Sequence, residues 1–424
     1  MYDLVVIGGG TAGCATAISA AKEGLKVLIV EKNSFLGGSM TGALVTPMMK
    51  NQLANGNILS GNFAQELMQK LQASNNSLTF SDNNNGWFNP EMLKCILDDL
   101  CEQYGVKIYF DSILCSAKIS NNQIESIEIL NCGQKKEIKS KYFVDTTGNG
   151  DLCAICNLNY DNGNNNQNQA MTLRFIAANV DIEKLAEFLE TIDEDKTITP
   201  ISKINNQIHL STACTWDNKN WKLRPLFEKA VKDNILKEED CAYFQIFTIP
   251  NQIGAIAFNA PRIFAEKNLN PLDVEDTSYA LIQGRKQIRR LFNFCQKYLK
   301  GFENAYISQI APMLGIRDSR RIEGEYKLCE EDILNTKKFK SAVAKSNYPI
   351  DVHSYQKDKS LLTEMQENEY YEIPLESLKS KTLSNLYFAG KIISTTFLAQ
   401  ASIRIIPNCL SMGESLGKFL AQQT

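Results

Sequence analysis

Tyr2-Asp-Leu-Val-Val-Ile7 runs straight into Gly8-Gly-Gly-Thr-Ala-Gly13, and this junction at the start of the chain decides the fold. A helix of small residues is expected next, and a second apolar run, Lys26–Val30, ends at the acidic residue Glu31. An apolar strand, a glycine turn, a helix and a second strand that ends in an acid form the front of a dinucleotide-binding βαβ unit. The sequence therefore predicts such a unit from Tyr2 to Glu31.

Each glycine of the turn has a physical role. Gly8 permits the tight turn, Gly10 lets the backbone approach a pyrophosphate closely, and Gly13 lets the helix pack against the strand. The first turn of the helix offers free N–H groups and a partial positive charge to phosphates. Glu31 follows Gly13 by 18 residues, and its carboxylate can accept hydrogen bonds from a ribose 2′-hydroxyl while repelling a 2′-phosphate. A tight turn without a ligand is the weaker alternative.

Length and composition describe an ordinary globular protein. The chain has 424 residues, 44% of them hydrophobic and 22% charged, which suits two or three domains. A formal net charge of −3 and the lack of a Lys/Arg-rich run argue against a nucleic-acid partner. No apolar stretch reaches the roughly 18 residues of a membrane span, and the N-terminus lacks the basic segment of a signal peptide. We expect a cytoplasmic protein, and the sequence leaves its oligomeric state open.

The 12 cysteines are scattered through apolar patterns, as in a reduced intracellular protein. Cys153 and Cys156 are closely spaced, and either a redox-active dithiol or ordinary packing fits that spacing. The chain has only 2 histidines, His209 and His353, so no metal site is expected.

Hydrophobic periodicity and turn residues predict the remaining elements. A helix opens at Pro90 and ends at Gly105. The expected strands are 106–110, 113–119, 124–130, 142–147, 171–176, 242–249, 253–258 and 386–390. The further expected helices are 182–190, 277–298 and 404–422. The order predicts an α/β fold. A Rossmann-like domain with a central parallel sheet plus a β-meander comprises residues 1–160 and 376–424, and an inserted α+β substrate or cap domain comprises residues 161–375.

Five more segments carry a resemblance that runs from Tyr2 to the last helix. They are Gly148-Asn-Gly-Asp151, Ala311–Arg321, Asn347–His353, Tyr371–Pro374 and Asn385–Gly390. With them the chain resembles the FAD-dependent oxidoreductases, within the glutathione-reductase-like flavoproteins that have two dinucleotide-binding domains. The resemblance implies that FAD is the cofactor and that the Rossmann-like domain binds it.

The resemblance also implies residues that hold FAD, from the adenosine to the flavin. The glycine turn would hold the pyrophosphate, Glu31 the adenosine ribose, and the start of the last helix the flavin's pyrimidine edge. A helix N-terminus there would stabilise the negative charge of reduced flavin. The implied residues are Gly8, Gly10, Thr11, Ala12, Gly13, Glu31, Lys32, Gly38, Ser39, Met40, Leu114, Thr146, Thr147, Gly148, Gly390, Ser402, Ile403, Arg404 and Ile405.

Two departures from the wider superfamily limit what the resemblance implies. Lys391 follows Gly390 where many relatives have an aspartate that bonds the ribityl chain. A second glycine-rich dinucleotide turn of the kind that holds NAD(P)H is missing after Gly13. Electrons are therefore expected to come from the substrate or from an external electron donor, or to leave to an external acceptor.

Arginines are the best polar candidates for catalysis. Arg404, Arg317 and Arg320 could anchor a substrate carboxylate by bidentate hydrogen bonds. The alternative is that Arg317 to Arg321 join two domains through ion pairs with Asp318, Glu323 or Glu325. His353 is a candidate acid or base, or a histidine held by Asp351. Arg174 could point into the cavity, and His209 is expected to be structural.

The sequence thus predicts an FAD-dependent oxidoreductase that transfers a hydride between a small, anionic organic substrate and non-covalently bound FAD. A flavin-dependent tRNA- or thiazole-type biosynthetic enzyme and a non-enzymatic flavin redox sensor remain alternatives. The identity of the substrate, of the electron donor or acceptor, and the direction of the reaction stay open.

Overall fold

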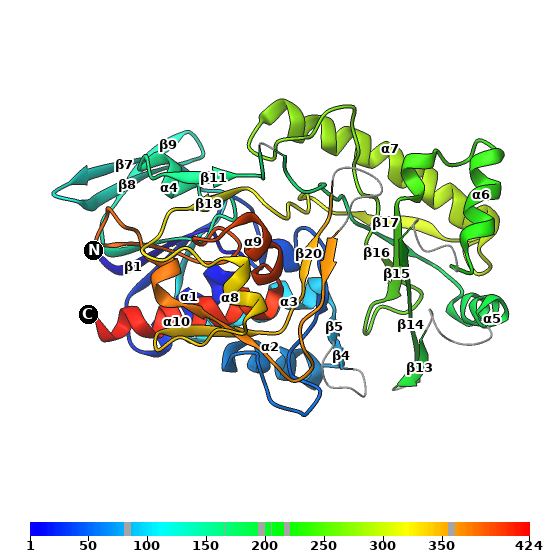
Figure 1. Ribbon diagram of the computed structural model, residues 1–424, viewed down its shortest axis with the longest axis horizontal. Helices are drawn as coiled ribbons and strands as arrows, with labels where there is room; N and C mark the ends of the chain where they lie inside the picture. Colours follow the sequence, from blue (N-terminus) through cyan, green and yellow to red (C-terminus); the bar gives the residue numbers. More distant parts are fainter. Residues whose placement is uncertain (80–85, 166, 194–199, 205, 216–220, 355–360) are drawn as a thin grey trace.

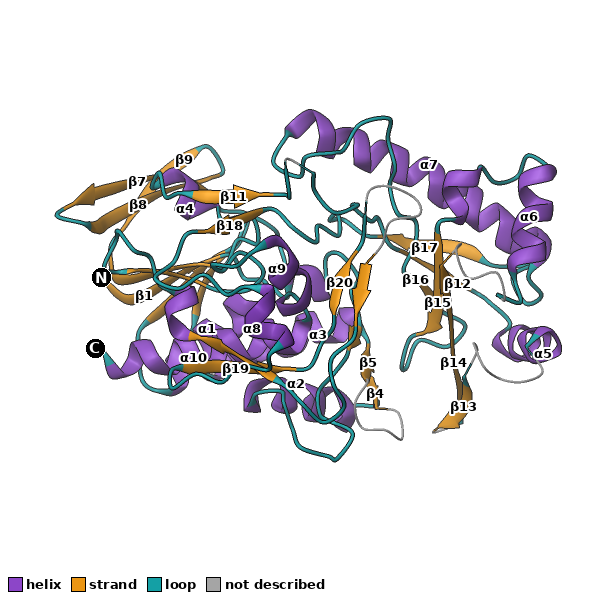
Figure 2. Cartoon of the chain, viewed as in Figure 1, coloured by secondary structure: helices purple, strands orange, loops and turns teal. Residues whose placement is uncertain are grey.

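The computed structural model describes residues 1–79, 86–165, 167–193, 200–204, 206–215, 221–354 and 361–424. Within them the chain forms two large sheets with covering helices, side by side along the longest axis of the molecule (Figure 1). Figure 2 shows helices, strands and loops in the same view. Both ends of the chain lie in the part remote from the antiparallel sheet.

The first part is built on a five-stranded parallel sheet with strand order β23-β10-β1-β2-β6. These strands are β1 (Tyr2–Ile7), β2 (Val27–Val30), β6 (Lys107–Tyr109), β10 (Ser140–Asp145) and β23 (Leu386–Phe388). All four residues of β2 are buried, as a central strand covered on both faces requires. The predicted α/β fold with a Rossmann-like parallel sheet is confirmed.

Two glycines let helix α10 (Ile406–Gln422) pack closely on helix α1 (Thr11–Lys22). A Cβ at Gly413 would lie 2.3 Å from a carbonyl oxygen of α1, and one at Gly417 would lie 2.4 Å from another. Both distances are far below a carbon–oxygen contact, so the two backbones meet only because these positions carry no side chain.

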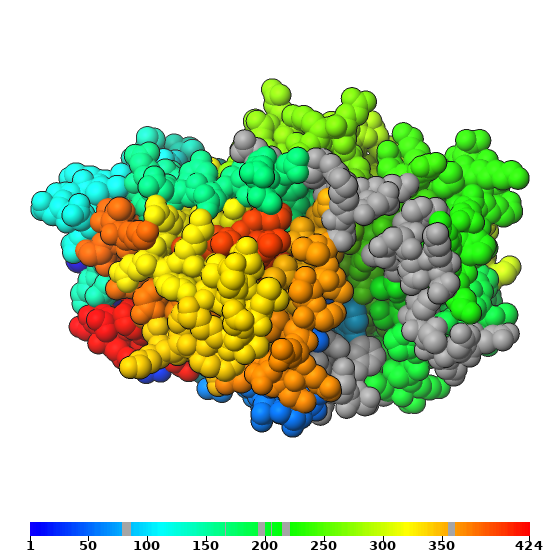
Figure 3. All heavy atoms as spheres, viewed as in Figure 1, coloured from blue at the N-terminus to red at the C-terminus, as the bar shows by residue number. Residues whose placement is uncertain are grey.

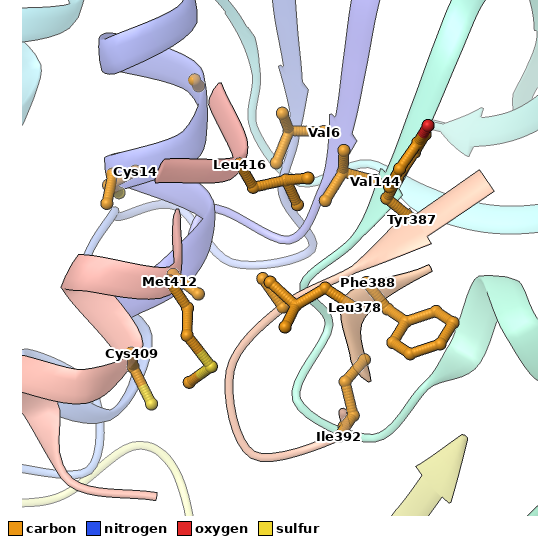
Figure 4. Packing of buried hydrophobic residues seen from close by; sticks show 14 of the residues in the cluster. Val6, Cys14, Val144, Leu378, Tyr387, Phe388, Ile392, Cys409, Met412 and Leu416 are labelled. Carbon is orange, nitrogen blue, oxygen red and sulfur yellow. The ribbon is translucent and has the colours of Figure 1, made fainter. Parts of the chain in front are cut away.

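The core of the first part lies between the sheet and α10. Figure 4 shows Leu416 and Met412 of α10 in one buried cluster with Val6 and Val144 of the sheet. Each of the four side chains has no exposed surface. The helix therefore completes the hydrophobic core that the parallel strands begin.

A three-stranded antiparallel meander, β7 (Ile113–Ser120), β8 (Gln123–Asn131) and β9 (Gln134–Ile138), joins β6 to β10. The first two strands confirm the expected ranges, and β9 is additional. Four of the five residues of β9 are exposed and polar, so it lacks the apolar alternation by which a strand is recognised.

The second part is a six-stranded antiparallel sheet with strand order β13-β14-β15-β16-β12-β17. Its strands are β12 (Phe175–Ala178), β13 (Ile201–Ile204), β14 (Gln207–Thr215), β15 (Tyr243–Thr248), β16 (Ile256–Phe258) and β17 (Tyr306–Ile310). Helices α5 (Ile182–Ile192), α6 (Arg224–Lys232) and α7 (Val274–Tyr298) accompany it. Phe175 stacks on Phe258 with ring centroids 4.0 Å apart, within a second hydrophobic core.

The residues predicted for the inserted domain, 161–375, contribute to both hydrophobic cores. Buried residues between Met171 and Ala311 belong to the second core, whereas Ile322, Leu328 and Ile373 belong to the first. The limits predicted at residues 161 and 375 stay a prediction. We propose a narrower inserted unit, about residues 170–316, because its apolar side chains pack on the antiparallel sheet.

The remaining elements are short or peripheral. The helices are α2 (Asn62–Ala73), α3 (Pro90–Gln103), α4 (Asp151–Ile155), α8 (Glu330–Leu334), α9 (Phe397–Ile403) and the 3₁₀ turns η1 (Gly38–Met40), η2 (Glu238–Cys241) and η3 (Leu375–Leu378). The strands are β3 (Pro47–Met48), β4 (Ser77–Thr79), β5 (Gly86–Phe88), β11 (Tyr160–Asn162), β18 (Arg320–Ile322), β19 (Ala342–Ser346), β20 (Ile350–Val352), β21 (Leu361–Thr363) and β22 (Tyr371–Pro374).

Several predicted boundaries were wrong: the strand expected over 253–258 begins at Ile256, and the helix expected over 277–298 begins at Val274. The last helix begins at Ile406 rather than at residue 404, because Pro407 fits the first turn of a helix and breaks its interior. The strand expected over 171–176 begins at Phe175, and Thr172 before it forms only isolated bridges to Arg262 and Gly315.

On the face shown in Figure 3, the green segments of the inserted unit lie to one side and the yellow, orange and red segments to the other.

Among the described residues, no helix is both long and apolar enough to cross a bilayer.

Candidate functional site

A cavity of about 360 Å³ lies at the carboxyl ends of the central strands. It is lined by Ile7, Gly8, Gly10, Val30, Glu31, Lys32, Asn33, Gly38, Ser112, Ile113, Leu114, Thr146, Thr147, Asp151, Ala154, Ile155, Met313 and Arg320. Ligands of open parallel sheets bind at this edge of the sheet. The cavity therefore stands where the glycine turn predicts a dinucleotide.

Three glycines of this cavity differ in what surrounds them. A Cβ at Gly8 would lie 2.6 Å from the Thr146 carbonyl oxygen, and one at Gly38 would lie 2.8 Å from the Gly10 Cα. A Cβ at Gly10 would meet no atom nearer than 3.8 Å and would project into the cavity. A side chain at Gly8 or Gly38 would therefore clash with the protein's own backbone. A side chain at Gly10 would not clash, so the glycine at this position leaves room in the cavity for a ligand.

Helix α1 presents its N-terminus to the cavity. Gly10 is its N-cap without a side-chain hydrogen bond, and the first turn holds no acidic residue. The N–H groups of a first helical turn have no intrahelical acceptors, so they can donate to an anion.

Glu31 is buried and fixed at the end of β2. Its Oε2 accepts a hydrogen bond from Gly9 N–H at 2.6 Å, and its Oε1 accepts from Asn33 N–H at 2.9 Å and Nδ2 at 2.6 Å. A carboxylate offers about four acceptor positions. The three bonds hold the carboxylate against the turn and leave one acceptor position at the cavity wall.

A second polar group, which we call the arginine cluster, lies between the two parts of the molecule. It consists of Arg174, Arg262, Arg317 and Arg404, with Asp351, His353, Tyr243 and Tyr348. The four guanidinium groups come from four separate segments: the start of β12, the loop after β16, the loop before β18, and the link between α9 and α10.

Three of these arginines are fixed mainly by neutral oxygen atoms. Arg174 donates to the Leu44 carbonyl at 3.1 Å, and Arg317 donates to the Ala170 carbonyl at 2.6 Å and to Thr172 Oγ1 at 2.8 Å. Arg404 donates to the Asp351 carbonyl at 2.9 Å. The bonds of Arg174 and Arg317 hold their guanidinium groups in place without neutralising them, whereas Arg404 also lies 3.6 Å from the Asp351 carboxylate.

Burial and mutual repulsion act on these charges together. The pKa of Arg317 is lowered, first by burial and then by the positive charges of Arg404, Arg262 and Arg174. The Arg262 guanidinium lies 4.5 Å from the centre of the Tyr243 ring. Burial also raises the pKa of the Tyr243 hydroxyl, so that this tyrosine is neutral.

Asp351 is the shared acceptor of the cluster. Its Oδ2 lies 3.0 Å from the Tyr348 hydroxyl, 3.0 Å from His353 Nε2 and 3.6 Å from an Arg404 nitrogen. The pKa of Asp351 is lowered because these partners outweigh its burial. The aspartate is therefore ionised and supplies one negative charge.

Both ring nitrogens of His353 are engaged. Nε2 lies 3.0 Å from Asp351 Oδ2, and Nδ1 lies 2.6 Å from an Arg262 nitrogen, which can only donate. The imidazole is therefore neutral, with its proton on Nε2. Burial, Arg317 and Arg262 lower its pKa well below the usual range.

Comparison with known proteins settles the family. The family model described as FAD dependent oxidoreductase matches residues 3–423. The chain belongs to this family. It is an FAD-dependent oxidoreductase, and FAD is its cofactor.

Individual relatives match shorter stretches. A soluble pyridine nucleotide transhydrogenase of Stutzerimonas stutzeri is 28% identical over 154 residues, 35% of this chain and 30% of that protein. A thioredoxin reductase of Ureaplasma parvum is 36% identical over 80 residues, 19% of this chain and 25% of that protein. The chain thus aligns with less than a third of the length of either relative.

A solved structure resembles nearly the whole chain. A geranylgeranyl bacteriochlorophyll reductase-like protein from Thermoplasma acidophilum gives a TM-score of 0.50 at 14% identity, with 99% of this chain and 78% of that chain covered. At this identity the likeness shows the fold alone.

The cavity fits the adenosine and pyrophosphate portion of FAD. A Cβ at Gly10 would occupy cavity space next to the uncapped start of α1, where a pyrophosphate needs close backbone approach. The carboxylate of Glu31 lies at the same wall of the cavity, directly after β2, where it can accept a hydrogen bond from a ribose hydroxyl. Both features are those that a dinucleotide requires.

The structure brings many of the residues predicted for FAD to this cavity. Gly8, Gly10, Glu31, Lys32, Gly38, Leu114, Thr146 and Thr147 line it. Of the others, Thr11, Ala12 and Gly13 form the first turn of α1, and Ser39 with fully buried Met40 lies in η1.

The segment at Gly390 and Lys391 lies beside the turn after β10. Gly148 and Gly390 have φ of 76° and 88°, and Lys391 follows with Nζ 2.8 Å from the Ile316 carbonyl. Burial lowers the pKa of Lys391 to about 8. A Cβ at Gly148 would lie 3.7 Å from Lys391 Cε, so this lysine lies beside the turn after β10.

The four residues predicted at the flavin's pyrimidine edge do not lie in one helical turn. Ser402 and Ile403 end α9 and are fully buried, and the Ser402 hydroxyl donates to the Tyr348 carbonyl at 2.6 Å. Arg404 and Ile405 form the link, and Ile405 is the N-cap of α10. Of the four predicted residues, only Arg404 and Ile405 therefore lie next to the N-terminus of α10.

Arg320 lies apart from Arg317. Its NH1 donates to the Asn149 carbonyl at 2.9 Å, 3.4 Å from Asp151 Oδ1, and it lines the FAD cavity rather than the arginine cluster. Arg317 lies in the loop before β18 and Arg320 is the first residue of that strand, so the two side chains leave the chain at structurally different positions.

The ion pairs weighed as an alternative for Arg317 to Arg321 are not seen among the described residues. Asp318 accepts from Gln169 N–H at 2.7 Å. Glu323 pairs with Lys381 and Glu325 with Lys379. These acidic groups are thus engaged with other partners.

Cys153 and Cys156 are packing residues in this geometry. Both are buried, and burial raises the pKa of Cys156 to about 12 and that of Cys153 well above its usual range. A reactive dithiol needs an exposed thiol of low pKa. His209 is likewise buried, with Nδ1 3.4 Å from Thr248 Oγ1.

Sequence reasoning missed Arg262, Tyr243 and Tyr348. Tyr348 stands inside the segment Asn347–His353 that carries the family resemblance, so it could have been included. Arg262 and Tyr243 lie in the insertion, where only strand pairing between β15 and β16 brings them together. No local pattern marks either residue.

Proposed function

We propose that this enzyme transfers a hydride between a small anionic organic substrate and non-covalently bound FAD. One observation carries the proposal: the Arg317 guanidinium donates to two neutral oxygen atoms, the Ala170 carbonyl and Thr172 Oγ1. It lies within reach of the positive charges of Arg404, Arg262 and Arg174. Buried charges in proteins are normally paired. An anionic substrate would pair with the Arg317 guanidinium.

The proposed contacts with FAD follow from the cavity. The turn Gly8–Gly13 with Gly38–Met40 would hold the pyrophosphate, Glu31 and Lys32 the ribose, and Leu114 and 146–148 the adenine end. Gly390 and the link at Arg404 would lie toward the flavin. Support comes from the open space at Gly10 and the uncapped helix α1.

FAD supplies the acceptor or donor of two electrons, which travel with one proton as a hydride. This chain's own residues bind and orient the substrate. Arg317 and Arg404 would fix its anionic group by charge-assisted hydrogen bonds. His353 would hold Arg262 rather than exchange a proton, because both of its ring nitrogens are engaged.

We further propose that the chain belongs among the glutathione-reductase-like flavoproteins and works in the cytoplasm with an external electron donor or acceptor. The parallel sheet followed by an antiparallel meander supports the first statement. The buried cysteines, none bonded to another among those described, support the second.

The test uses the purified holoenzyme under anaerobic conditions. Heating should release free FAD, and lactate, malate or glycerate should bleach the visible flavin absorbance, whereas the uncharged 1,2-propanediol should not. In the reverse direction, the corresponding 2-oxo acids should reoxidise the reduced enzyme.

Variants locate the activity. Arg317→Gln should abolish bleaching by acids and keep the bound FAD, and Arg289→Gln on the exposed face of α7 should change neither. Equal bleaching by neutral alcohols, or no electron exchange with any carboxylate in either direction, would contradict the proposal.

A further inference from the structure

We propose that the protein binds a small, neutral, polyhydroxylated molecule in a second cavity, which lies between helix α2 with strand β4 and strands β13 and β14. This cavity of about 220 Å³ is lined by Gln72, Asn75, Ser77, Leu78, Ile204, Gln207, His209, Pro250 and Asn251. None of these residues lines the FAD cavity. A ligand held here therefore occupies a site of its own.

The second cavity also lies apart from the arginine cluster. Strand β15 runs from Tyr243, which belongs to the cluster, to Thr248, two residues before Pro250 at the cavity wall. The ends of a six-residue strand are about 17 Å apart, because each residue advances the chain by about 3.4 Å. The proposed ligand thus uses different residues from the proposed substrate.

The walls of the second cavity are polar and uncharged. Most of the lining side chains carry an amide, a hydroxyl or an imidazole group, and none of them is an acid, a lysine or an arginine. Burial lowers the pKa of His209, which keeps its imidazole neutral. A charged ligand would lose its hydration here without gaining an opposite charge, which is costly. Amides and hydroxyls offer both donors and acceptors, so the cavity suits a neutral molecule rich in hydroxyl groups.

His209 has a ring nitrogen left for such a ligand. The residue keeps only 5% of its surface exposed, and its Nδ1 lies 3.4 Å from Thr248 Oγ1. Its Nε2 has no hydrogen-bond partner among the residues that the structure describes. Since His209 lines the cavity, this nitrogen is the atom to which we assign a hydroxyl group of the ligand.

Hydrogen bonds within the protein hold the polar wall in place before a ligand enters. Gln207 Nε2 donates to the Ile249 carbonyl at 3.1 Å, and Gln207 Oε1 accepts from Asn251 N–H at 3.1 Å. Asn251 Nδ2 donates to Asn76 Oδ1 at 3.3 Å, which joins the inserted unit to the segment after α2. A wall fixed in this way loses little conformational freedom when it binds a ligand.

The volume of the cavity limits the size of the ligand. About 220 Å³ is less than the roughly 300–1,000 Å³ of pockets that hold drug-sized molecules. Leu78, Ile204 and Pro250 add an apolar portion of the wall, against which C–H groups can pack. A monosaccharide or a polyol of similar size has both the dimensions and the mixture of groups that the cavity requires.

The experiment observes His209 directly in the FAD-loaded enzyme. The chain has only 2 histidines, so ¹³C-labelled histidine gives two imidazole signals, and the signal lost in His209→Phe identifies His209. Glucose, mannitol and myo-inositol are titrated against gluconate, which carries a carboxylate at C1 of glucose. We expect at least one neutral probe to shift the His209 signal saturably while the His353 signal stays in place. Gluconate should bind about 10-fold more weakly or not at all, because its charge finds no partner.

Variants test the assigned residues by calorimetric titration with the neutral probe that binds. His209→Phe keeps a planar ring without nitrogen atoms, and the affinity should fall by about 3- to 10-fold, the effect of one neutral hydrogen bond. Gln72→Trp fills the cavity from an exposed position of α2 and should abolish binding. Gln69→Trp, at an exposed position of the same helix that does not line the cavity, should leave the affinity unchanged.

Three results would overturn the inference. They are a His209 signal that no neutral probe shifts saturably, equal binding of gluconate and the neutral probes, and an affinity that Gln72→Trp leaves unchanged. Because Gln72 is exposed, its variant does not put folding at risk and keeps the test decisive if His209→Phe fails to fold.

Discussion

At the scale of the residue, two glycines of one turn have separable tasks. A Cβ at Gly13 would lie 1.9 Å from the Gly8 carbonyl oxygen, whereas one at Gly10 would meet nothing nearer than 3.8 Å. Gly13 therefore serves the packing of the chain, and Gly10 serves the ligand.

This difference predicts opposite effects of the same substitution. Gly10→Ala should leave the unfolding temperature of the FAD-free protein unchanged and weaken FAD binding by about 10-fold or more, about 1.4 kcal/mol. Gly13→Ala should destabilise the FAD-free protein by about 1–3 kcal/mol through overpacking. Thermal unfolding without FAD and FAD titration separate the two. Destabilisation of the FAD-free protein by Gly10→Ala would contradict the assignment.

Lys391 gives a residue-scale prediction about pH. Burial lowers its pKa from 10.5 to about 8, with Asp318 acting in the opposite direction and Arg404 and Lys32 in the same direction. Between these pH values the unfolded chain binds more protons than the folded one, so the contribution of Lys391 to stability rises with pH. Below pH 8 the penalty for the buried ammonium group is fully present.

The measurement compares the FAD-free protein with its Lys391→Met variant by chemical denaturation from pH 7 to 10. The variant should be the more stable at pH 7, and its advantage should shrink as the pH rises through 8 and beyond. A difference that is independent of pH would show that the lysine is not buried as a charge.

At the scale of the element, the contact between α1 and α10 depends on Gly413 and Gly417. Replacing a helical glycine by alanine normally gains about 1 kcal/mol of helix propensity. A Cβ at Gly417 would lie 2.4 Å from the Thr16 carbonyl oxygen, a backbone atom that yields only if the helix moves. Overpacking of this kind costs about 1–3 kcal/mol.

We therefore expect Gly417→Ala to lower the free energy of unfolding despite its better helix propensity. Gln422→Ala, at an exposed position of the same helix, should not lower it. Urea denaturation of the two variants provides the comparison, and a stabilised Gly417→Ala protein would disprove the close approach of the helices.

The sequence predicted those elements whose side chains follow a period. The buried β1 and β2, the helix capped by Asn89 before Pro90, and the long α7 have strong local signals. Strand β9 lacks apolar alternation and was missed. The break at Arg404 was missed although Pro407 marks it, because the apolar run on either side continues through the link.

At the scale of the whole molecule, the two halves of the site differ in how far sequence reveals them. The FAD cavity is formed largely by contiguous motifs at strand ends, so its residues could be named in advance. The arginine cluster assembles segments that are far apart in the chain. Arg262 and His353 are 91 residues apart, and only the tertiary structure brings them within 2.6 Å.

The two parts of the molecule contribute different residues to the site. The cofactor cavity belongs almost wholly to the part built on the parallel sheet, and Arg174, Tyr243 and Arg262 belong to the part built on the antiparallel sheet. A descendant of this protein can therefore acquire a new chemical preference by altering strands β12, β15 and β16 while inheriting its redox carrier intact. Diversification of the insertion against a constant flavin module is the evolutionary course that this architecture favours.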